Sequence, residues 1–331
     1  MTTSSERFPS TAPLIAALPD SPDRPLWSVM IPVYNCAAFL CEALQSVLAQ
    51  DMGAQAMQIQ VVDDASTDAD VEALVLEIGA GRVEYFRQAE NVGSLRNFET
   101  CINHARGHLV HLLHGDDRVL LGFYQKLTSL FEKYPLVGAA FSHHAFIDES
   151  GIRRYTPPLV DPAEGLLDNW LLRIAQQVYT QYVAIAVRRS VYEKLGGFYG
   201  TSYGEDWEMW VRIARHYPFA YSPELLAEYR VHSGSISWEK ARSGQIISDL
   251  SRVIKRIEKH LPQHERARIS RIARKYYASY NIDVAYEVFQ ETGNWTLAYA
   301  QVKRSLSMSN HPSIYYKLLN INLKIVRSKL K

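Results

Sequence analysis

The chain has 331 residues, 47% of them apolar and 21% charged, a composition of soluble globular proteins that leaves room for one large α/β domain and an appendage. We expect neither a secretion signal nor a membrane span, because no charged stretch precedes an apolar core at the N-terminus and no apolar run is long enough. The net charge is +1, but residues 245–331 carry 16 basic against 6 acidic side chains, whereas residues 1–244 carry 20 against 29.

The cysteines and the charge distribution exclude further classes of protein. Cys36, Cys41 and Cys101 form no CxxC pair, and an odd cysteine count argues against a disulfide framework. We therefore expect a reducing, cytoplasmic compartment. The basic C-terminal region would suit nucleic acid, but no nucleic-acid-binding signature accompanies it, so we expect no such partner.

Composition predicts three regions. Residues 1–25 are rich in Ser, Thr and Pro, which predicts a disordered N-terminal arm. Residues 26–240 alternate predicted strands and helices and form the expected α/β domain. Residues 241–331 are basic and helical, with Gly293-Asn294 as a break between two helices.

The first half of the chain alternates apolar runs with amphipathic segments, and this pattern predicts a mostly parallel sheet. Pro32 is expected near the exit of the first strand, because proline cannot donate to a ladder. Thr67 or Asp68 is expected to cap the second helix. Strands are predicted over 27–33, 57–62, 83–87 and 108–113, with helices over 37–50, 69–78 and from about 94 to 105.

The second half continues with a less regular pattern. We expect a hairpin turn at 148–151 and successive helices in the C-terminal region. Helices are predicted over 123–134, 168–177, 189–195, 207–217, 246–260, 263–278, 280–292 and 295–308, with strands over 137–147, 183–187 and 226–231.

The most informative stretch runs from Leu112 to Asp117, where an apolar strand ends in two adjacent carboxylates. Ligands of open α/β sheets gather beyond the carboxyl ends of the strands. Two acids at that place can hold Mg²⁺ or Mn²⁺, which take one or two carboxylates and fill their other positions with water and phosphate. The alternative is a loop with two solvated aspartates.

Two further residues follow neighbouring strands. Tyr34 comes just after the first strand and offers a flat face for stacking a nucleotide base, and Asp64 comes just after the second and can accept a hydrogen bond from the base edge. Each could instead be a turn residue. No GxGxxG or GxxxxGK[ST] motif is present, so the main sequence evidence for a dinucleotide-binding site or a P-loop is absent.

Asp206 and His232 complete the candidate set. Asp206 follows Glu205 at a predicted helix start. Interaction with the helix dipole can explain one of these two acids, and a carboxylate in a cleft can act as a general base. His232 follows the last predicted strand and is a candidate metal ligand, with an ordinary surface histidine as the alternative. His108, His111 and His114 are interpreted as structural, with His114 near the site.

In this order and at these spacings, the motifs resemble the inverting nucleotide-sugar glycosyltransferases of family 2, which have the GT-A fold. The resemblance covers about residues 27–237. It is carried by Ile31-Pro-Val-Tyr-Asn35, Val61-Val-Asp-Asp-Ala-Ser-Thr-Asp68, Asn91-Val-Gly93 with Arg96-Asn97, His114-Gly-Asp-Asp117, Gly204-Glu-Asp-Trp207 and Tyr229-Arg-Val-His232.

The resemblance implies a role for each matching residue. Pro32 and Tyr34 would contact the base, Asp64 would bind its edge, and Arg96 would lie near the phosphates or the ribose. Asp116 would approach the ribose or donor sugar. Asp117 and His232 would ligate Mn²⁺ or Mg²⁺, and Asp206 matches the catalytic base. Arg118 stands where many members have an acid, which would lower the negative charge of the motif.

The expected activity is therefore metal-dependent, inverting transfer of a sugar from a UDP- or dTDP-sugar to a hydroxyl group of a glycan or lipid-linked acceptor. By resemblance to bacterial members, the pathway would be cell-surface polysaccharide synthesis. The alternatives are a non-catalytic scaffold of the same fold that binds sugar nucleotides, and a nucleotidyltransferase, which would need a Gly-rich basic loop where Tyr34-Asn35-Cys36 stands.

The end of the chain has two interpretations. Ser313–Lys331 carries five basic residues and no acid, with Leu318, Ile321 and Ile325 on one helical face. Such a segment can attach to an anionic membrane, which would place the enzyme peripherally at the inner face of the cell membrane. The simpler interpretation is a helical cap on the acidic catalytic domain.

Overall fold

The computed structural model describes residues 7–19, 21 and 23–329, which divide into two compact units. The first unit comprises the chain up to residue 170 with 179–202 and 212–231, and the second comprises 171–178, 203–211 and 232–331. The last segment of the second unit thus starts at His232, where the expected boundary was residue 241, and the unit also includes two earlier segments from within the α/β region.

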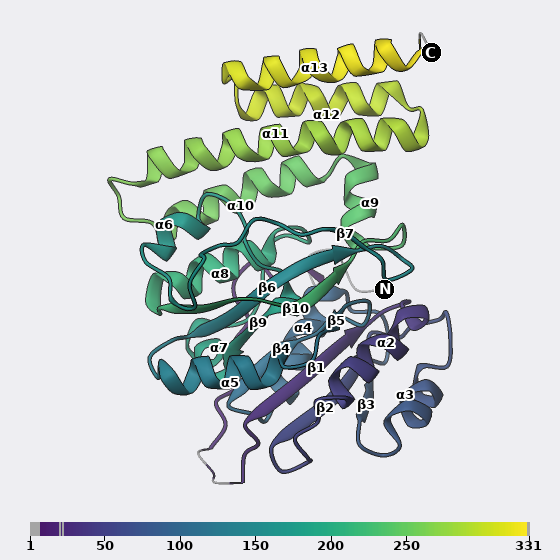
Figure 1. The fold of residues 1–331 in the computed structure, drawn as a ribbon, viewed down its shortest axis with the longest axis vertical. Helices are drawn as coiled ribbons and strands as arrows, with labels where there is room; N and C mark the ends of the chain where they lie inside the picture. The colour runs from purple at the N-terminus through teal and green to yellow at the C-terminus, as the bar shows by residue number, and fades with distance from the viewer. Residues whose placement is uncertain (1–6, 20, 22, 330–331) are drawn as a thin grey trace. The chain divides into compact units, whose positions relative to one another are not determined.

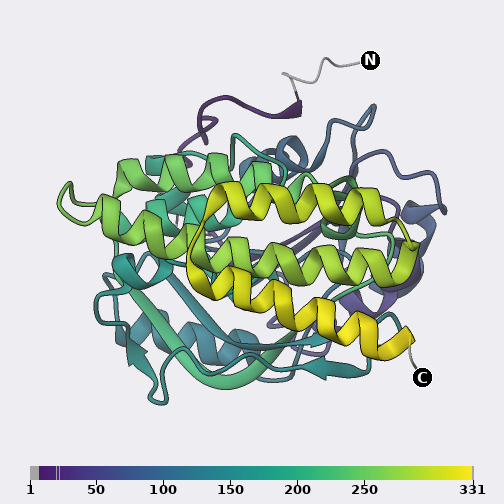
Figure 2. The same cartoon turned by 90° about the horizontal axis from the view of Figure 1, so that it is seen from above.

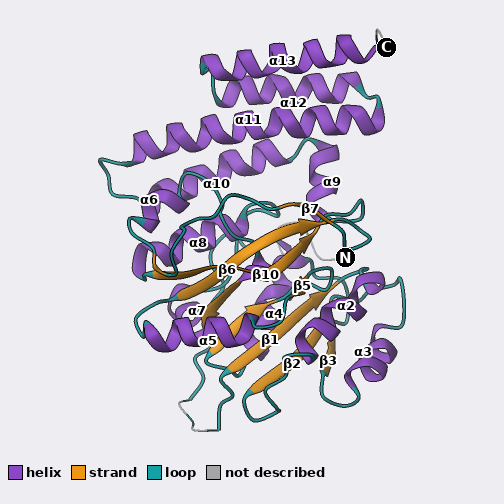
Figure 3. Ribbon diagram, viewed as in Figure 1, coloured by secondary structure: helices purple, strands orange, loops and turns teal. Residues whose placement is uncertain are grey.

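The first unit is built on one mixed sheet with the strand order β3-β2-β1-β4-β9-β6-β10-β5 (Figures 1 and 3). The parallel pairs are β1 with β2 and β4, β2 with β3, and β6 with β10, while β9 runs antiparallel between β4 and β6. The strands are β1 (Trp27–Val33), β2 (Met57–Asp63), β3 (Glu84–Arg87), β4 (Leu109–Leu112), β5 (Arg118–Val119), β6 (Ala139–Ile147), β7 (Arg153–Tyr155), β8 (Gly165–Leu166), β9 (Ile185–Arg188) and β10 (Phe219–Arg230).

Helices cover both faces of this sheet. Every residue of β1 and β2 is buried, as expected for parallel strands between two helical layers. Alternate residues such as Val29 and Ile31 face the core shared with α2, α3 and α5, whereas Ser28 and Gln58 hydrogen-bond toward the end of α4. The helices are α2 (Ala37–Leu48), α3 (Val71–Gly79), α4 (Ser94–His104), α5 (Phe123–Lys133), α7 (Arg189–Leu195) and α8 (Glu205–His216), which crosses between the units.

The second unit is helical. Helix α11 packs against α10, α12 and α13, and Figure 2 shows α11, α12 and α13 lying side by side. Asn281 is buried in this bundle, where its amide donates to Gln301 O and Ser305 Oγ. The helices are α6 (Trp170–Ile174), α9 (Ile236–Ser243), α10 (Ile246–His260), α11 (Arg266–Thr292), α12 (Trp295–Met308) and α13 (Pro312–Lys329). Across the described ranges, no helix is long and apolar enough to cross a membrane.

Residues 7–19 correct the expectation of a disordered arm. Ile15 is buried, Pro13 O accepts a hydrogen bond of 2.9 Å from Gly197 N, and Arg189 donates to Ala16 O at 3.1 Å. A segment rich in Ser and Pro has no core of its own, but its carbonyls can still bind a preformed domain. The rest of the expected arm, apart from 21 and 23–25, lies outside the described residues.

Several predicted elements differ from the observed ones. Helix α11 runs unbroken through the predicted gap at residue 279, and β10 begins at Phe219 instead of Leu226. Helix α3 is capped by Asp70, whose carboxylate accepts from Ala73 N at 3.0 Å. Asp68 binds Ala37 N at the start of α2 instead. The short elements β5, β7, β8 and α9 had not been predicted.

Candidate active site

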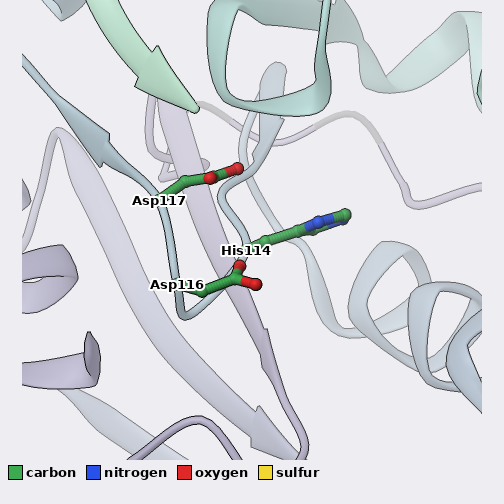
Figure 4. A group of neighbouring side chains, drawn as sticks. All are labelled: His114, Asp116 and Asp117. Carbon is green, nitrogen blue, oxygen red and sulfur yellow. The ribbon is translucent and has the colours of Figure 1, made fainter. Parts of the chain in front are cut away.

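The aspartate loop, residues 114–117, follows β4 and gathers three potential ligand side chains. One ligand atom from each of His114, Asp116 and Asp117 lies within 4.8 Å of the others, and Figure 4 shows the three side chains on the same turn of the chain. The predicted carboxylate pair is therefore brought together at the carboxyl end of a parallel strand, with a histidine beside it.

Asp117 has one satisfied and one unsatisfied oxygen. Its Oδ1 accepts from Arg230 N at 2.8 Å, while Oδ2 is buried and has no hydrogen-bond partner among the described residues. Burial and the neighbouring Asp116 carboxylate raise the pKa of Asp117 well above its ordinary value. A buried carboxylate in this state is poised to gain from a cation.

His114 lies at the site, as the sequence indicated. Its ring stacks on Phe98 with centroids 5.1 Å apart and contacts Tyr182 at 4.5 Å, which fixes its direction. Within the described chain its Nε2 is buried without a hydrogen-bond partner. Burial lowers the pKa of His114, so the neutral ring, the form that ligates metals, is favoured.

The three side chains fit a divalent cation. Two carboxylates supply the hard oxygen ligands that Mn²⁺ and Mg²⁺ prefer, and one of the orphaned atoms, Asp117 Oδ2, is such an oxygen. His111 does not join them, because its two ring nitrogens contact Tyr124 Oη and Val183 O inside the core, each at 3.1 Å. That histidine is structural, as predicted.

Arg230, at the end of β10, anchors the aspartate loop and was given no role from the sequence. Its side chain is 1% exposed, its Nε donates to Asp116 O at 2.8 Å, and its Nη2 contacts Glu42 Oε2 at 2.8 Å. Its Nη1 donates to Asp148 O and Glu149 O. Together with the bond from its own N–H to Asp117, this guanidinium fixes both aspartates.

Arg118 and Gly115, which flank the two aspartates, have structural roles. Arg118 binds Glu228 and Glu42, each at 2.7 Å, so its charge is already balanced and does not neutralise the aspartates as the sequence had suggested. Gly115 is required by packing, because an added Cβ would lie 2.9 Å from both Cys36 Sγ and Val33 Cγ2.

Asp64 lies at the end of β2 but binds a neighbouring loop. Its Oδ1 accepts from Val92 N at 2.8 Å, and its Oδ2 accepts from Gly93 N at 2.9 Å and Asn91 Nδ2 at 3.0 Å. The side chain is buried, and burial raises its pKa to about 6, with the backbone hydrogen bonds opposing the shift. Asp64 therefore holds residues 91–93 beside the carboxyl end of β2.

The other predicted nucleotide contacts lie on or near the same sheet edge. Tyr34 follows β1 with 49% of its surface exposed, so its ring is available to a ligand. Pro32 lies beyond the last β4 partner of β1, and its carbonyl accepts from Gly115 N at 3.2 Å. Arg96, in the first turn of α4, pairs with Glu99 at 2.6 Å.

Asp206 belongs to the second unit and stands in the first turn of α8. Burial raises its pKa to about 6, against the lowering effect of the Trp207 and Asp206 backbone N–H groups. The next two residues fix the helix start: Trp207 Nε1 donates to Ile174 O at 2.6 Å, and Glu208 binds His260 at 2.8 Å. A raised pKa makes a carboxylate a stronger base, which suits the predicted role of general base.

His232 also belongs to the second unit. It precedes the cap of α9, and its carbonyl accepts from Ser235 N at 3.2 Å, while Ser235 Oγ accepts from Trp238 N. The sequence places one residue between His232 and Arg230.

Sequence comparisons identify relatives of this chain. An uncharacterised protein of Mycobacterium tuberculosis is 31% identical over 232 residues, which cover 63% of this chain and 68% of the relative. A putative glycosyltransferase of Bacillus subtilis is 27% identical over 200 residues, 57% of this chain and 66% of the relative. An uncharacterised glycosyltransferase of Mycoplasma genitalium matches over 45% of its own length, with 29% identity over 41% of this chain.

Solved structures share the fold. S. aureus TarS residues 1–349 in complex with UDP-GlcNAc matches with a TM-score of 0.64 and 15% identity, over 85% of this chain and 79% of that one. A mannosyltransferase from Pyrobaculum calidifontis in complex with GDP-Man and Mn²⁺ matches with a TM-score of 0.56 and 20% identity, over 95% and 90%. The predicted GT-A-type α/β fold with a C-terminal helical region is thereby confirmed.

The family model for glycosyl transferase family 2 matches residues 28–196, which include β1 and β4, the Asp64 turn and the aspartate loop. The match spans more than half of the chain and covers four of the six motifs on which the resemblance rested, whereas Gly204–Trp207 and Tyr229–His232 lie beyond it. The chain belongs to glycosyl transferase family 2.

Proposed function

We propose that this chain is a metal-dependent, inverting glycosyltransferase of the hexosyltransferase type that uses a UDP- or dTDP-sugar. The observation that carries the proposal is the buried Asp117 Oδ2, which lacks a partner among the described residues and lies with Asp116 and His114 at the end of a parallel strand. The acceptor would be a hydroxyl group of a glycan or of a lipid-linked acceptor in bacterial cell-surface polysaccharide synthesis.

The donor nucleotide would bind along the edge formed by β1, β2 and β4. The exposed ring of Tyr34 supplies a stacking face beside Pro32, and Asp64 shapes the 91–93 loop and retains acceptor capacity for the base edge. Arg96 would exchange its surface partner Glu99 for the phosphates or the ribose. Two structural neighbours support this proposal, because they hold UDP-GlcNAc and GDP-Man.

The cation would be held by Asp117 with His114 beside it, and Asp116 would face the ribose or the donor sugar. The resemblance alone adds His232 as a further ligand. Bound Mn²⁺ or Mg²⁺ would stabilise the charge that grows on the nucleoside diphosphate as it leaves. The Mn²⁺ in the mannosyltransferase complex supports this choice of ion. Arg230 keeps both aspartates in place without occupying Asp117 Oδ2.

Asp206 would supply the base. With its pKa raised to about 6, the carboxylate is mostly ionised at pH 7 yet basic enough to take a proton from an acceptor hydroxyl. The acceptor oxygen then attacks the anomeric carbon while the bond to the nucleoside diphosphate breaks on the opposite side. One displacement inverts the anomeric centre, so no covalent enzyme intermediate is required.

The metal assignment is tested by electron paramagnetic resonance of Mn²⁺ titrated into the protein with UDP present. Asp117→Asn should weaken Mn²⁺ binding by at least about tenfold, because the amide removes the charge but keeps the shape. Glu72→Gln, at an exposed position of α3, is the matched control and should bind as wild type. Equal Mn²⁺ affinity in wild type and Asp117→Asn would refute the assignment.

Peripheral contact of residues 313–331 with an anionic membrane is a secondary part of the proposal. Leu318 and Ile321 are not available for it, because they pack inside the second unit against the cluster of Ala278, Ile282 and Ile314. The exposed side chains Tyr315, Tyr316 and Leu319 remain. Sedimentation with anionic vesicles should decrease when these three become serine, and unchanged sedimentation would remove the membrane from the account.

A further inference from the structure

The second unit contains a cavity of about 450 Å³ that the proposed transfer reaction does not use. It lies among the end of α10, the first turns of α11 and the α12–α13 connection, all within the second unit. A cavity of this size is in the range of small-molecule sites, which hold a ligand with a few fixed polar groups. Its chemistry can be derived from the residues that line it.

The lining is strongly basic. Arg266, Arg271 and Arg274 line the cavity, and the one acidic side chain in its wall is Glu258. Glu258 already accepts a hydrogen bond of 2.6 Å from Ser270 Oγ and lies 3.8 Å from the Arg274 guanidinium. Three guanidinium groups therefore share one carboxylate, which leaves two positive charges in excess.

Arg266 and Arg271 have side-chain N–H donors that can bind a ligand. Arg271 has no hydrogen bond or ion pair within the described part of the chain, and its side chain is exposed. Arg266 uses Nε to hold Leu261 O at 3.1 Å, which orients the side chain and leaves the two terminal nitrogens. Planar guanidinium groups bind phosphate oxygens with two parallel hydrogen bonds, which an ammonium group cannot do.

Two further features favour an anion. Arg266 and Ala267 belong to the first turn of α11, a helix of 27 residues, so its positive dipole end faces the cavity wall. Ser309 and Asn310 add neutral hydrogen-bonding groups from the α12–α13 connection. Among the lining residues only Ala267 and Met308 are apolar residues.

We propose that this cavity is a binding site for a phosphate group, carried by a soluble phosphate ester or diphosphate or by a phospholipid head group. Arg266 and Arg271 bind the phosphate. Arg274 already contacts Ser270 and Glu258 and does not take part directly. The site concerns the second unit alone, so it stands or falls independently of the donor and metal assignments at the aspartate loop.

Met308 provides a local reporter. The chain has six methionines, and the ¹³C-labelled methyl signal of Met308, assigned with a Met308→Leu variant, is followed while inorganic pyrophosphate is added. EDTA is present throughout, so that metal-dependent binding at the aspartate loop does not contribute. The signal should shift to saturation, and potassium chloride at equal ionic strength should not reproduce the shift.

Variants assign the binding to the arginines. Arg266→Ala with Arg271→Ala should weaken pyrophosphate binding by about tenfold or more, and alanine preserves the helix. Arg268→Ala is the matched control, because Arg268 lies on the same turns of α11 but pairs with Glu265 at 2.6 Å and does not line the cavity. It should bind as wild type.

A vesicle titration separates the sources of phosphate. A Met308 shift with phosphatidylglycerol vesicles but not with pyrophosphate assigns the site to a lipid head group, and the reverse assigns it to a soluble ester. Three results would contradict the proposal. The Met308 signal could fail to shift in both titrations, the shift could persist unchanged in the double variant, or potassium chloride could produce the same shift.

Discussion

Arg230 is the residue on which the geometry of the aspartate loop depends most. Its guanidinium is buried, binds Asp116 O, Asp148 O, Glu149 O and Glu42, and stacks over Phe39 at 4.8 Å. A planar group with five donors can satisfy this set, whereas a lysine ammonium cannot. The sequence could not single out Arg230, because its partners lie in α2 and in the loops after β4 and β6, far away in the chain.

Arg230→Lys should leave the protein folded but weaken Mn²⁺ binding by roughly 10- to 100-fold, because the loop loses its bridging donors. The measurement is Mn²⁺ titration by paramagnetic resonance beside thermal unfolding. Arg188→Lys is the control: Arg188 also holds two carbonyls, Val137 O and Phe131 O, in the first unit, so its loss should reduce stability without changing Mn²⁺ affinity. Equal effects of both variants on Mn²⁺ would contradict the role of Arg230.

The raised pKa of Asp206 predicts how the activity should fall at low pH. In the proposed mechanism the ionised carboxylate is the active form, and its pKa is raised to about 6, so kcat/KM should fall as the pH decreases below about 6, which forms the acid limb of its pH profile. Asp206→Asn should bind donor normally, lose roughly 10²–10⁴-fold in kcat and lose this limb. An asparagine variant that keeps the wild-type limb would show that another group titrates.

At the scale of elements, the strands that position the site could be predicted because they are short apolar runs buried on both faces. Strand β1 and the start of β2 were predicted as observed. The N-terminal half of β10 was missed; this strand contains Pro223 and has register shifts between Ser222 and Ala227, so it lacks the regular pattern of β1. Helix α11 was predicted as two helices with a gap at residue 279, but it runs unbroken, and the buried Asn281 is held by its bonds to α12.

The 91–93 loop is held to the sheet by Asp64, and its order should depend on that carboxylate. Asp64→Ala leaves Val92 N and Gly93 N without acceptors, so local opening should become easier by about 1–3 kcal/mol. Hydrogen exchange at these two amides measures the change. Asp70→Ala, which removes the cap of α3, should speed exchange in α3 alone. Unchanged protection of Val92 and Gly93 would show that the loop is ordered by other contacts.

At the scale of the whole molecule, the basic C-terminal region is not a simple appendage. The second unit includes 203–211, and Trp207 packs against Tyr277 of α11 with ring centroids 4.7 Å apart. Tyr277 in turn accepts from Val178 N at 3.0 Å. Composition identified the basic region but could not reveal these insertions, because they come from segments whose own pattern is that of the α/β domain.

A fragment of residues 232–331 should therefore be markedly less stable than the same helices in the full chain. It lacks Trp207, and removing a buried tryptophan typically costs about 3–5 kcal/mol. Circular dichroism with thermal unfolding is the measurement, with a full-length Trp207→Ala protein as comparison. A fragment that unfolds cooperatively at the temperature of the intact protein would show that the inserted segments contribute little.

The central claim is that a donor nucleotide binds with a cation at Asp117, and calorimetry of UDP and dTDP binding with and without Mn²⁺ tests it most directly. We predict that one of the two nucleotides binds wild type in the presence of Mn²⁺, that omitting Mn²⁺ weakens this binding, and that Asp117→Asn abolishes the metal dependence. Failure of both nucleotides to bind under every metal condition, or equal metal-dependent binding in the variant, would contradict the account.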